Sequence, residues 1–123
     1  MAGGLTLDAG ALIAAEKNRR EFWAIWKLAL QRDARITVPA VVLAQAWRGN
    51  SSSIARLLPT CIVEPMDEAG AKRIGAWLGR TRQNDVVDAA VVVGAVVRGD
   101  TIVTSDPDES GACSVPRACG FAS

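Results

Sequence analysis

Aspartates occur at three places along the chain that could form one site. Two of these places directly follow β-type runs, and the third lies between the two runs. Asp8 ends the run at residues 5–7, and Asp106 follows the run at residues 101–104. Carboxylates at the carboxyl ends of neighbouring parallel strands converge in one crevice. Anionic groups gathered in this way repel one another unless protons or a cation intervene. Hard oxygen ligands favour Mg²⁺ or Mn²⁺, so the pattern predicts a metal site.

The third position holds Asp85 and Asp88, which lie three residues apart. Side chains at this spacing share one face of a helix. Asp88 stands among apolar residues at 86, 87 and 89–91, and a carboxylate in such surroundings needs a partner or a metal ion. We therefore expect Asp88 to be functional. The alternative for this pair is a helix cap followed by a solvated surface residue.

Ordinary structural roles also fit the other aspartates. Asp8 suits the N-cap of a helix, and capping is compatible with metal binding if its two oxygens divide the roles. The sequence Thr-Ser-Asp-Pro-Asp at 104–108 could form a turn without a function, but its position after a strand favours Asp106 as a ligand. Asp108 is expected to be a turn residue or to contact the metal ligands without binding the metal itself. Asp100 is expected to be a turn residue before the strand at 101–104.

The composition excludes several other kinds of catalysis. The chain has no His and no Tyr, which removes Ser-His-Asp and Cys-His mechanisms and zinc sites built on imidazole. The three cysteines include no C-x-x-C pair, so neither a disulfide framework nor a zinc ribbon is expected. Any chemistry must come from carboxylates, amides, hydroxyl groups and basic side chains.

Length, hydropathy and charge predict one cytoplasmic domain. The chain has 123 residues, of which 50% are hydrophobic, and a net charge of +1. Residues 1–60 are basic overall and residues 61–123 are acidic overall. This asymmetry suits a phosphate-binding surface beside a metal site, or ordinary solvated helix faces. The apolar run at 89–97 is too short to span a bilayer, and the N-terminus lacks the features of a signal peptide.

Strands and helices are expected to alternate along the chain, which predicts an α/β fold with a parallel sheet and helices on both faces. Residues 85–98 are rich in Val, but their length favours a buried helix over a strand. Pro39 suits the first turn of a helix. Residues 109–123 show no period and are expected to form an irregular tail. The expected strands are at residues 5–7, 35–38, 61–63 and 101–104, and the expected helices are at 9–17, 21–32, 39–47, 54–58, 68–78 and 85–98.

Taken together, four sequence motifs resemble a PIN domain, and within that family the VapC-type toxins of bacterial toxin–antitoxin pairs. Each motif is weak alone, but the ordered set covers residues 4–108 at the spacing of the family. The motifs are Leu-Asp8-Ala-Gly-Ala-Leu-Ile, Val38-Pro39-Ala-Val-Val-Leu-Ala-Gln45-Ala-Trp47-Arg, Asp85-Val-Val-Asp88-Ala, and Arg-Gly-Asp-Thr-Ile-Val-Thr104-Ser-Asp106.

This resemblance implies a single domain over residues 1–123 with a three-layer α/β/α PIN-like fold and a central parallel sheet of four or five short strands. It also implies a metal-dependent ribonuclease that hydrolyses RNA phosphodiester bonds. Asp8, Asp88 and Asp106 fall on the first, third and fourth acids of the family and would hold Mg²⁺ or Mn²⁺. Thr104 matches the hydroxyl residue before the last acid, and Asp85 matches an additional acid of many members.

Two departures from the family pattern bear on activity. Gln45 stands where the family has its second acid, usually Glu, and an amide brings no charge and cannot act as a general base. The metal affinity or the rate is therefore expected to be reduced. The tail after Asp108 lacks the helix and strand that PIN domains usually carry there. These departures leave an alternative function open, that of a catalytically weak or inactive module that binds RNA or an antitoxin.

Two other α/β families match less well. Haloacid-dehalogenase-type phosphatases need Asp-x-Asp after the first strand, where this chain has Asp8-Ala-Gly10. Toprim nucleases need a Glu where this chain has Asp8. The PIN resemblance therefore remains the better explanation of the motifs.

The toxin resemblance implies an RNA substrate, a small antitoxin protein and a second copy of the chain in a homodimer. The antitoxin would cover the helices near Trp23, Trp26 or Trp47 and block the site. Candidate contacts for the RNA backbone are Arg48, Arg56 and Arg82.

Overall fold

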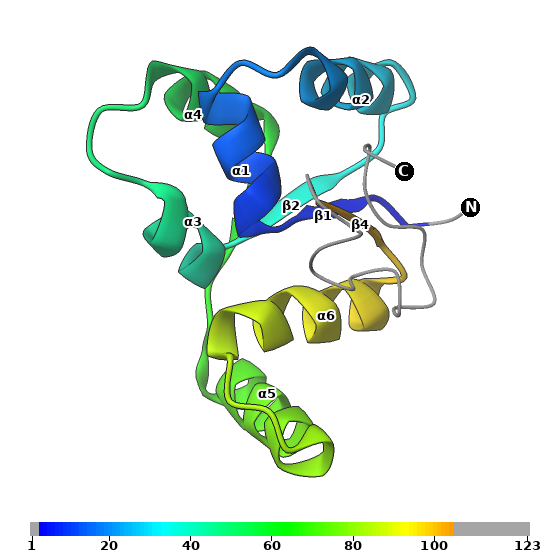
Figure 1. The fold of residues 1–123 in the computed structure, drawn as a ribbon. Helices are drawn as coiled ribbons and strands as arrows, with labels where there is room; N and C mark the ends of the chain where they lie inside the picture. The colour runs from blue at the N-terminus through cyan, green and yellow to red at the C-terminus, as the bar shows by residue number, and fades with distance from the viewer. Residues whose placement is uncertain (1–2, 105–123) are drawn as a thin grey trace.

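The computed structural model describes residues 3–104, and its centre is a sheet of parallel strands (Figure 1). In this part of the chain the sheet has four strands in the order β3-β2-β1-β4. Leu5 lies opposite Ile36 on one side and Thr101 on the other. The parallel sheet predicted from the sequence is confirmed. The strands are β1 (Leu5–Leu7), β2 (Ile36–Pro39), β3 (Ile62–Glu64) and β4 (Thr101–Val103).

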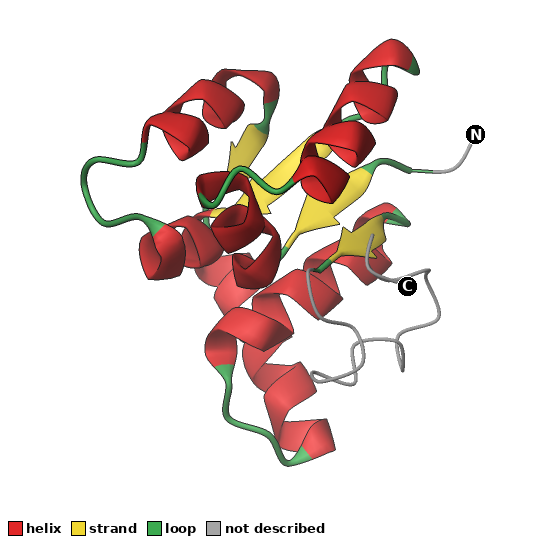
Figure 2. Cartoon of the chain, turned by 45° about the horizontal axis from the view of Figure 1, so that its top comes forward, coloured by secondary structure: helices red, strands yellow, loops and turns green. Residues whose placement is uncertain are grey.

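Helices cover both faces of the sheet, so the fold has the three α/β/α layers expected from the sequence. α1, α2 and α4 lie on one face, and α6 lies on the other with α5 packed outside it (Figures 1 and 2). No helix in residues 3–104 combines the length and the apolar character needed to cross a membrane. The helices are α1 (Ala9–Glu16), α2 (Arg20–Gln31), α3 (Ala40–Ala46), α4 (Ser52–Leu57), α5 (Glu68–Thr81) and α6 (Val86–Arg98), with a 3-10 turn at Leu58–Thr60.

α6 contributes to two apolar clusters. Val91 and Ala95 belong to the main core between the sheet and the helices, together with Phe22 of α2. Val93 belongs to a second cluster, in which Ile74 of α5 packs against α6. The expected helix at 85–98 is thus confirmed. The expectation of a buried helix is only partly met, because Val86, Val96 and Val97 are exposed.

Local sequence signals explain where most helices begin and end. Side-chain oxygens of the N-cap residues accept backbone N–H groups at the starts of four helices, which satisfies donors that the helix leaves free. Arg82 and Gly99 end α5 and α6 in the left-handed conformation. The four side-chain caps are Asp8, Ser51, Asp67 and Asp85.

Pro39 differs from the sequence expectation. It is the last residue of β2, where it lies opposite Glu64, and it caps α3 with φ −60° and ψ 137°. The fixed φ of proline fits an extended residue as well as a helical one, and a strand end tolerates the missing N–H. The helix therefore begins one residue later than expected.

Candidate functional site

The carboxyl end of β1 positions Asp8. Its backbone N–H donates to the carbonyl of Val103 in β4, at 3.2 Å. Its side-chain Oδ1 accepts the N–H of Ala11 at 2.8 Å and so caps α1. Asp8 is therefore held by the sheet through its main chain and by a helix through one carboxylate oxygen. Its carboxylate also receives a hydrogen bond from the backbone of Gly10.

Thr104 lies beside Asp8 at the end of β4. Its side chain is 3% exposed, and its hydroxyl group hydrogen-bonds the Asp8 carboxylate. The pairing follows from the register, because Leu7 lies opposite Val103 and each strand then continues by one residue. The structure thus brings together two of the residues that the sequence selected from opposite ends of the chain.

Asp85 and Asp88 stand at the start of α6. Asp85 caps the helix, and its Oδ1 accepts the backbone N–H of Asp88 at 3.0 Å. Both side chains are exposed to solvent. The argument that apolar neighbours bury Asp88 is therefore wrong: a helix turns Ala89, Ala90 and Val91 toward the core and leaves Asp88 outside. The assignment of Asp88 as a ligand remains a prediction.

One small cavity of about 120 Å³ joins these groups. Asp8, Asp85 and Asp88 line it, and α3 contributes Gln45, which is exposed. The four polar residues come from three separate segments of the chain. The remaining lining residues are Ala9, Gly10, Val87 and Val91.

The charges of these carboxylates disfavour one another. Burial raises the pKa of Asp8 above its ordinary value, and the charge of Asp88 raises it further, although hydrogen bonds from Thr104 and the backbone act in the opposite direction. Partial desolvation by the neighbouring protein groups also raises the pKa of Asp88, although its side chain reaches solvent, and the charge of Asp85 raises it further. A cation in the cavity would relieve both effects, because it favours the charged form of each carboxylate.

The predicted metal-ligand set is only partly described. Asp106 lies outside the described residues, as do Asp108 and the tail at 109–123. Within residues 3–104, no three carboxylate or thiol side chains are grouped closely enough to hold a metal ion. The donors that are described do fit Mg²⁺ or Mn²⁺ in kind, since three carboxylates and one amide oxygen face the cavity and none of its lining residues is basic.

Sequence reasoning missed a cluster around Asp100. Asp100 was expected to be a turn residue, but it is 2% exposed and accepts hydrogen bonds from Gly4 and Thr6. It also forms an ion pair with Arg98, which in turn pairs with Glu64. The only local signal was an acid directly before an apolar strand. Gly4 and Thr6 are more than 90 residues away from Asp100, so no sequence window contains them.

The arginine and tryptophan residues that the sequence singled out have different surroundings. The guanidinium of Arg56 lies over the ring of Trp23 at 5.5 Å. Trp23 and Trp26 pack edge to face, and both are half-buried. Arg48 is exposed and donates to the carbonyl of the preceding residue at 3.0 Å. Arg48 is thus available for contacts with a ligand, whereas Arg56 already has an aromatic partner.

Known proteins share this fold without close sequence similarity. No protein-family model matches the sequence, and no curated protein matches it either. Among solved structures, a chain of VapBC2 from Rickettsia felis, bound to a DNA fragment from their promoter, has a TM-score of 0.68 and 15% identity. The similarity covers 94% of this chain and 96% of that chain.

A second solved structure has the same fold. VapC20 from Mycobacterium tuberculosis, described as a toxin that cleaves the sarcin-ricin loop, has a TM-score of 0.63 and 18% identity. The similarity covers 89% of this chain and 95% of VapC20. The protein therefore has the PIN-like α/β fold of VapC toxins, and the fold expectation from the sequence motifs is confirmed.

Proposed function

We propose that the protein is a metal-dependent ribonuclease that hydrolyses RNA phosphodiester bonds in the cytoplasm and serves as the toxin of a toxin–antitoxin pair. The observation that carries the proposal is the cavity lined by Asp8, Asp85 and Asp88, three carboxylates from two separate segments of a VapC-like fold. The description of VapC20 as a toxin that cleaves the sarcin-ricin loop agrees with an RNA substrate.

Asp8, Asp88 and Asp106 would hold Mg²⁺ or Mn²⁺. The bound cation would supply Lewis acidity toward the phosphate and lower the pKa of a water molecule. Mg²⁺ usually keeps several of its waters, so a small number of protein ligands is sufficient.

The protein's own groups have distinct tasks in this proposal. Thr104 and the N–H of Ala11 fix the orientation of the Asp8 carboxylate. Asp85 gives one oxygen to the cap of α6 and leaves the other to orient the attacking water. Gln45 cannot accept a proton from that water, but its amide can position the water or a phosphate oxygen.

The size of the cavity limits what enters it. A volume of about 120 Å³ has room for a phosphate group and a little water, but not for a nucleoside. The RNA backbone would therefore cross the surface with one phosphate at the carboxylates. Two exposed arginines adjoin the segments that form the site, since Arg48 follows α3 and Arg82 precedes α6. They are suited to hold the neighbouring phosphates.

The test is cleavage of total cellular RNA by the purified protein in Mg²⁺, in Mn²⁺ and in EDTA. Asp88→Asn should abolish metal-dependent cleavage. Glu68→Gln is the matched control, because Glu68 is the acidic residue in the first turn of α5 as Asp88 is in α6. Cleavage that persists in EDTA, or in Asp88→Asn at the rate of Glu68→Gln, would refute the proposed mechanism.

The presence of Gln45 in the cavity favours one second candidate, a PIN-like module that binds RNA or an antitoxin with little turnover. The two candidates differ in the effect of Gln45→Glu. In a metal-dependent nuclease that lacks an acid at this position, the substitution should increase cleavage. In a binding module, the wild type and Gln45→Glu should both retain RNA in a filter-binding assay, and neither protein should cleave it.

The proposed antitoxin surface centres on the aromatic pair of α2. Trp23 and Trp26 are half-buried, and Leu28 and Leu30 of the same helix are 45% and 40% exposed. Aromatic residues with one exposed side are enriched in protein interfaces. If the protein is expressed together with its neighbouring small gene, the two products should co-purify, and Trp26→Ala should weaken the complex. Purification of the protein alone from such a strain would contradict this part of the proposal, and so would an unchanged complex in Trp26→Ala.

A further inference from the structure

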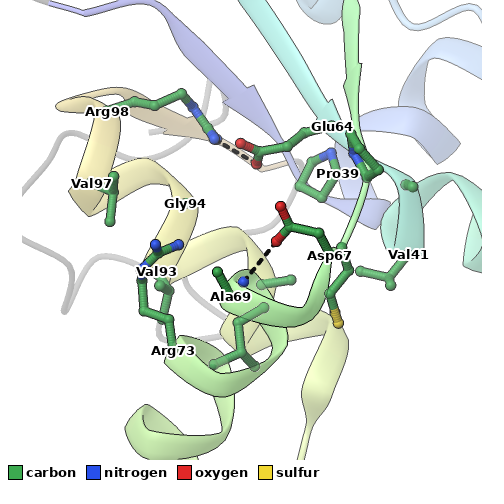
Figure 3. A pocket seen from close by; sticks show the side chains of 16 residues that line it. Pro39, Val41, Glu64, Asp67, Ala69, Arg73, Val93, Gly94, Val97 and Arg98 are labelled. Atoms are coloured by element: carbon green, nitrogen blue, oxygen red, sulfur yellow. Dashed lines mark hydrogen bonds and ion pairs between the residues drawn. The ribbon is translucent and has the colours of Figure 1, made fainter.

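Arg98, in the last turn of α6, donates from all three nitrogens of its guanidinium group. Nε lies 2.9 Å from Asp100 Oδ2, Nη1 lies 2.6 Å from Glu64 Oε1, and Nη2 lies 2.9 Å from Thr6 Oγ1. The Arg98 side chain is only 15% exposed. Figure 3 shows the guanidinium reaching across to Glu64 from the end of α6.

The acceptors of Arg98 belong to three different strands or their ends. Thr6 lies in β1, Glu64 ends β3, and Asp100 directly precedes β4. Asp100 is satisfied on its other oxygen by the N–H of Gly4, at 2.7 Å. One guanidinium group thus connects α6 to both edges of the sheet and to its centre. Each of these bonds is directional, and a charged partner makes it shorter and stronger than a neutral one.

Gly94 provides the space in which the guanidinium lies. A Cβ atom at this position would stand 2.9 Å from Nη2 and 3.2 Å from Nη1 of Arg98. The Arg98 side chain therefore folds back along α6 and lies close against Gly94, one helical turn earlier in the sequence. A side chain at position 94 would force the guanidinium, which is the far end of a flexible side chain, to shift from this position.

The other contacts of α6 fix the rotation and axial position of the helix less strictly. Its buried side chains are short, namely Ala89, Ala90, Val91, Val93 and Ala95. Hydrophobic burial is non-directional, so a stripe of small apolar residues tolerates a small rotation or shift of the helix. The three bonds of Arg98 do not, because the planar guanidinium reaches all of its partners in one orientation only.

We propose that Arg98 is a positioning residue for the site: through Thr6, Glu64 and Asp100 it fixes the rotation and axial position of α6, and thereby holds Asp88 across the cavity from Asp8. Asp88 is about 15 Å from Arg98 along the same helix, and a helix transmits a rotation over this length as a rigid rod. This inference rests on the proposed function, since it assigns Arg98 to the geometry of the proposed metal site.

The experiment compares Gly94→Ala and Arg98→Lys with the wild-type protein, and uses Gly75→Ala as the matched control. Gly75 lies within α5, where an added Cβ meets nothing within 4 Å. Both Gly→Ala changes favour the helix by the same intrinsic propensity, but only Gly94→Ala displaces the guanidinium. Each protein is examined by circular dichroism for folding, by electron paramagnetic resonance for Mn²⁺ affinity, and by RNA cleavage as a function of Mn²⁺ concentration.

We expect Gly94→Ala and Arg98→Lys to remain folded at 25 °C and to bind Mn²⁺ about tenfold more weakly, because changes in the groups that orient metal ligands usually cost 10–100-fold in affinity. The Mn²⁺ concentration for half-maximal cleavage should rise by the same factor, and Gly75→Ala should match the wild type. A purely structural role predicts a loss of folded protein with an unchanged Mn²⁺ affinity of the folded fraction, which would overturn the proposal.

Other outcomes are equally decisive. If Gly94→Ala binds Mn²⁺ within twofold of the wild type, Arg98 does not position the site. If Gly94→Ala and Arg98→Lys are both unfolded at 25 °C, the cluster is structural and the positioning role is wrong. If the wild type binds Mn²⁺ but cleaves no RNA, the proposed function fails while the binding data still test Arg98. A wild type that neither binds Mn²⁺ nor cleaves RNA refutes both.

Discussion

Replacement of Asp8 by Asn should stabilise the metal-free protein at neutral pH. The Asp8 carboxylate accepts the N–H of Ala11 at 2.8 Å, and Asn caps helices about as well as Asp. Asp8→Asn therefore keeps the capping bond and removes only the charge. Burial and the charge of Asp88 raise the pKa of Asp8 despite its hydrogen bonds, so the charged form is the one that the fold disfavours.

The pH dependence has a definite sign. The pKa of Asp8 in the folded protein lies above its ordinary value of 3.8. Ionisation of Asp8 therefore lowers the free energy of unfolding of the wild type as the pH rises from 3.8 through the raised value. Asp8→Asn has no carboxyl group at this position, so its free energy of unfolding does not fall for this reason. The two proteins should be equally stable at the acid end of that window, and the variant should be more stable above it.

The magnitude follows from the removal of one charge while the capping bond to Ala11 is kept. Relief of an unfavourable charge in a functional site commonly stabilises a protein by about 0.5–2 kcal/mol, so we expect a gain of about 1 kcal/mol at pH 7. For a domain of this size that gain raises Tm by about 4 °C. Asp8→Ala removes the charge and the cap together. Because loss of the cap costs about 1 kcal/mol and the buried Thr104 hydroxyl also loses its Asp8 partner, its stability should be below that of the wild type.

The assay is urea or thermal unfolding in EDTA from pH 4 to pH 8, followed by repetition with excess Mg²⁺. Mg²⁺ at 100 times its Kd should stabilise the wild type by about 2.7 kcal/mol, and it should have no comparable effect on Asp8→Asn. If Asp8→Asn is less stable than the wild type at pH 7 in EDTA, burial does not dominate the energetics of Asp8. A difference that is independent of pH would also refute the reasoning.

Two further predictions concern the buried acid and the surface arginine. Asp100→Ala should lower the free energy of unfolding by about 3–5 kcal/mol, because it leaves the Arg98 guanidinium buried without one of its charged partners; urea unfolding would measure this, and a loss below 1 kcal/mol would show that Glu64 alone compensates the charge. Arg48→Ala should weaken RNA binding and reduce the slope of its salt dependence by about one, as a binding assay in a KCl series would reveal. An unchanged slope would exclude a phosphate contact by Arg48.

Local signals in the sequence were sufficient for the secondary structure. The helices that begin after Asp8, Asp67 and Asp85 do so because a short carboxylate side chain satisfies backbone N–H groups two or three residues ahead, which is a property of a few consecutive residues. The end of α6 at Gly99 is equally local, since glycine adopts the left-handed conformation without strain. Most element boundaries nevertheless differ from the expected ones by one to three residues. At Pro39 the reason is physical, because its φ value suits both a strand end and a first helical turn.

Part of the site was also predictable. Asp8 and Thr104 could be paired from the sequence because parallel strands deliver their carboxyl ends to the same edge of a sheet. The meeting of Gln45, Asp85 and Asp88 with Asp8 in one cavity agrees with the ordered motifs of the resemblance. Their distances along the chain alone do not predict it.

The tertiary structure alone decided which charges are buried. Asp88 stands in an apolar stretch and yet is exposed, because the rotation of α6 sends its neighbours inward and the carboxylate outward. Asp100 stands in a polar turn sequence and yet is 2% exposed, because Gly4 and Thr6 of the β1 segment and Arg98 of α6 converge on it. The sequence indicates which residues can cap a helix, form a turn or face the core. Whether a charged group finds its partners depends on the packing of segments that are distant along the chain.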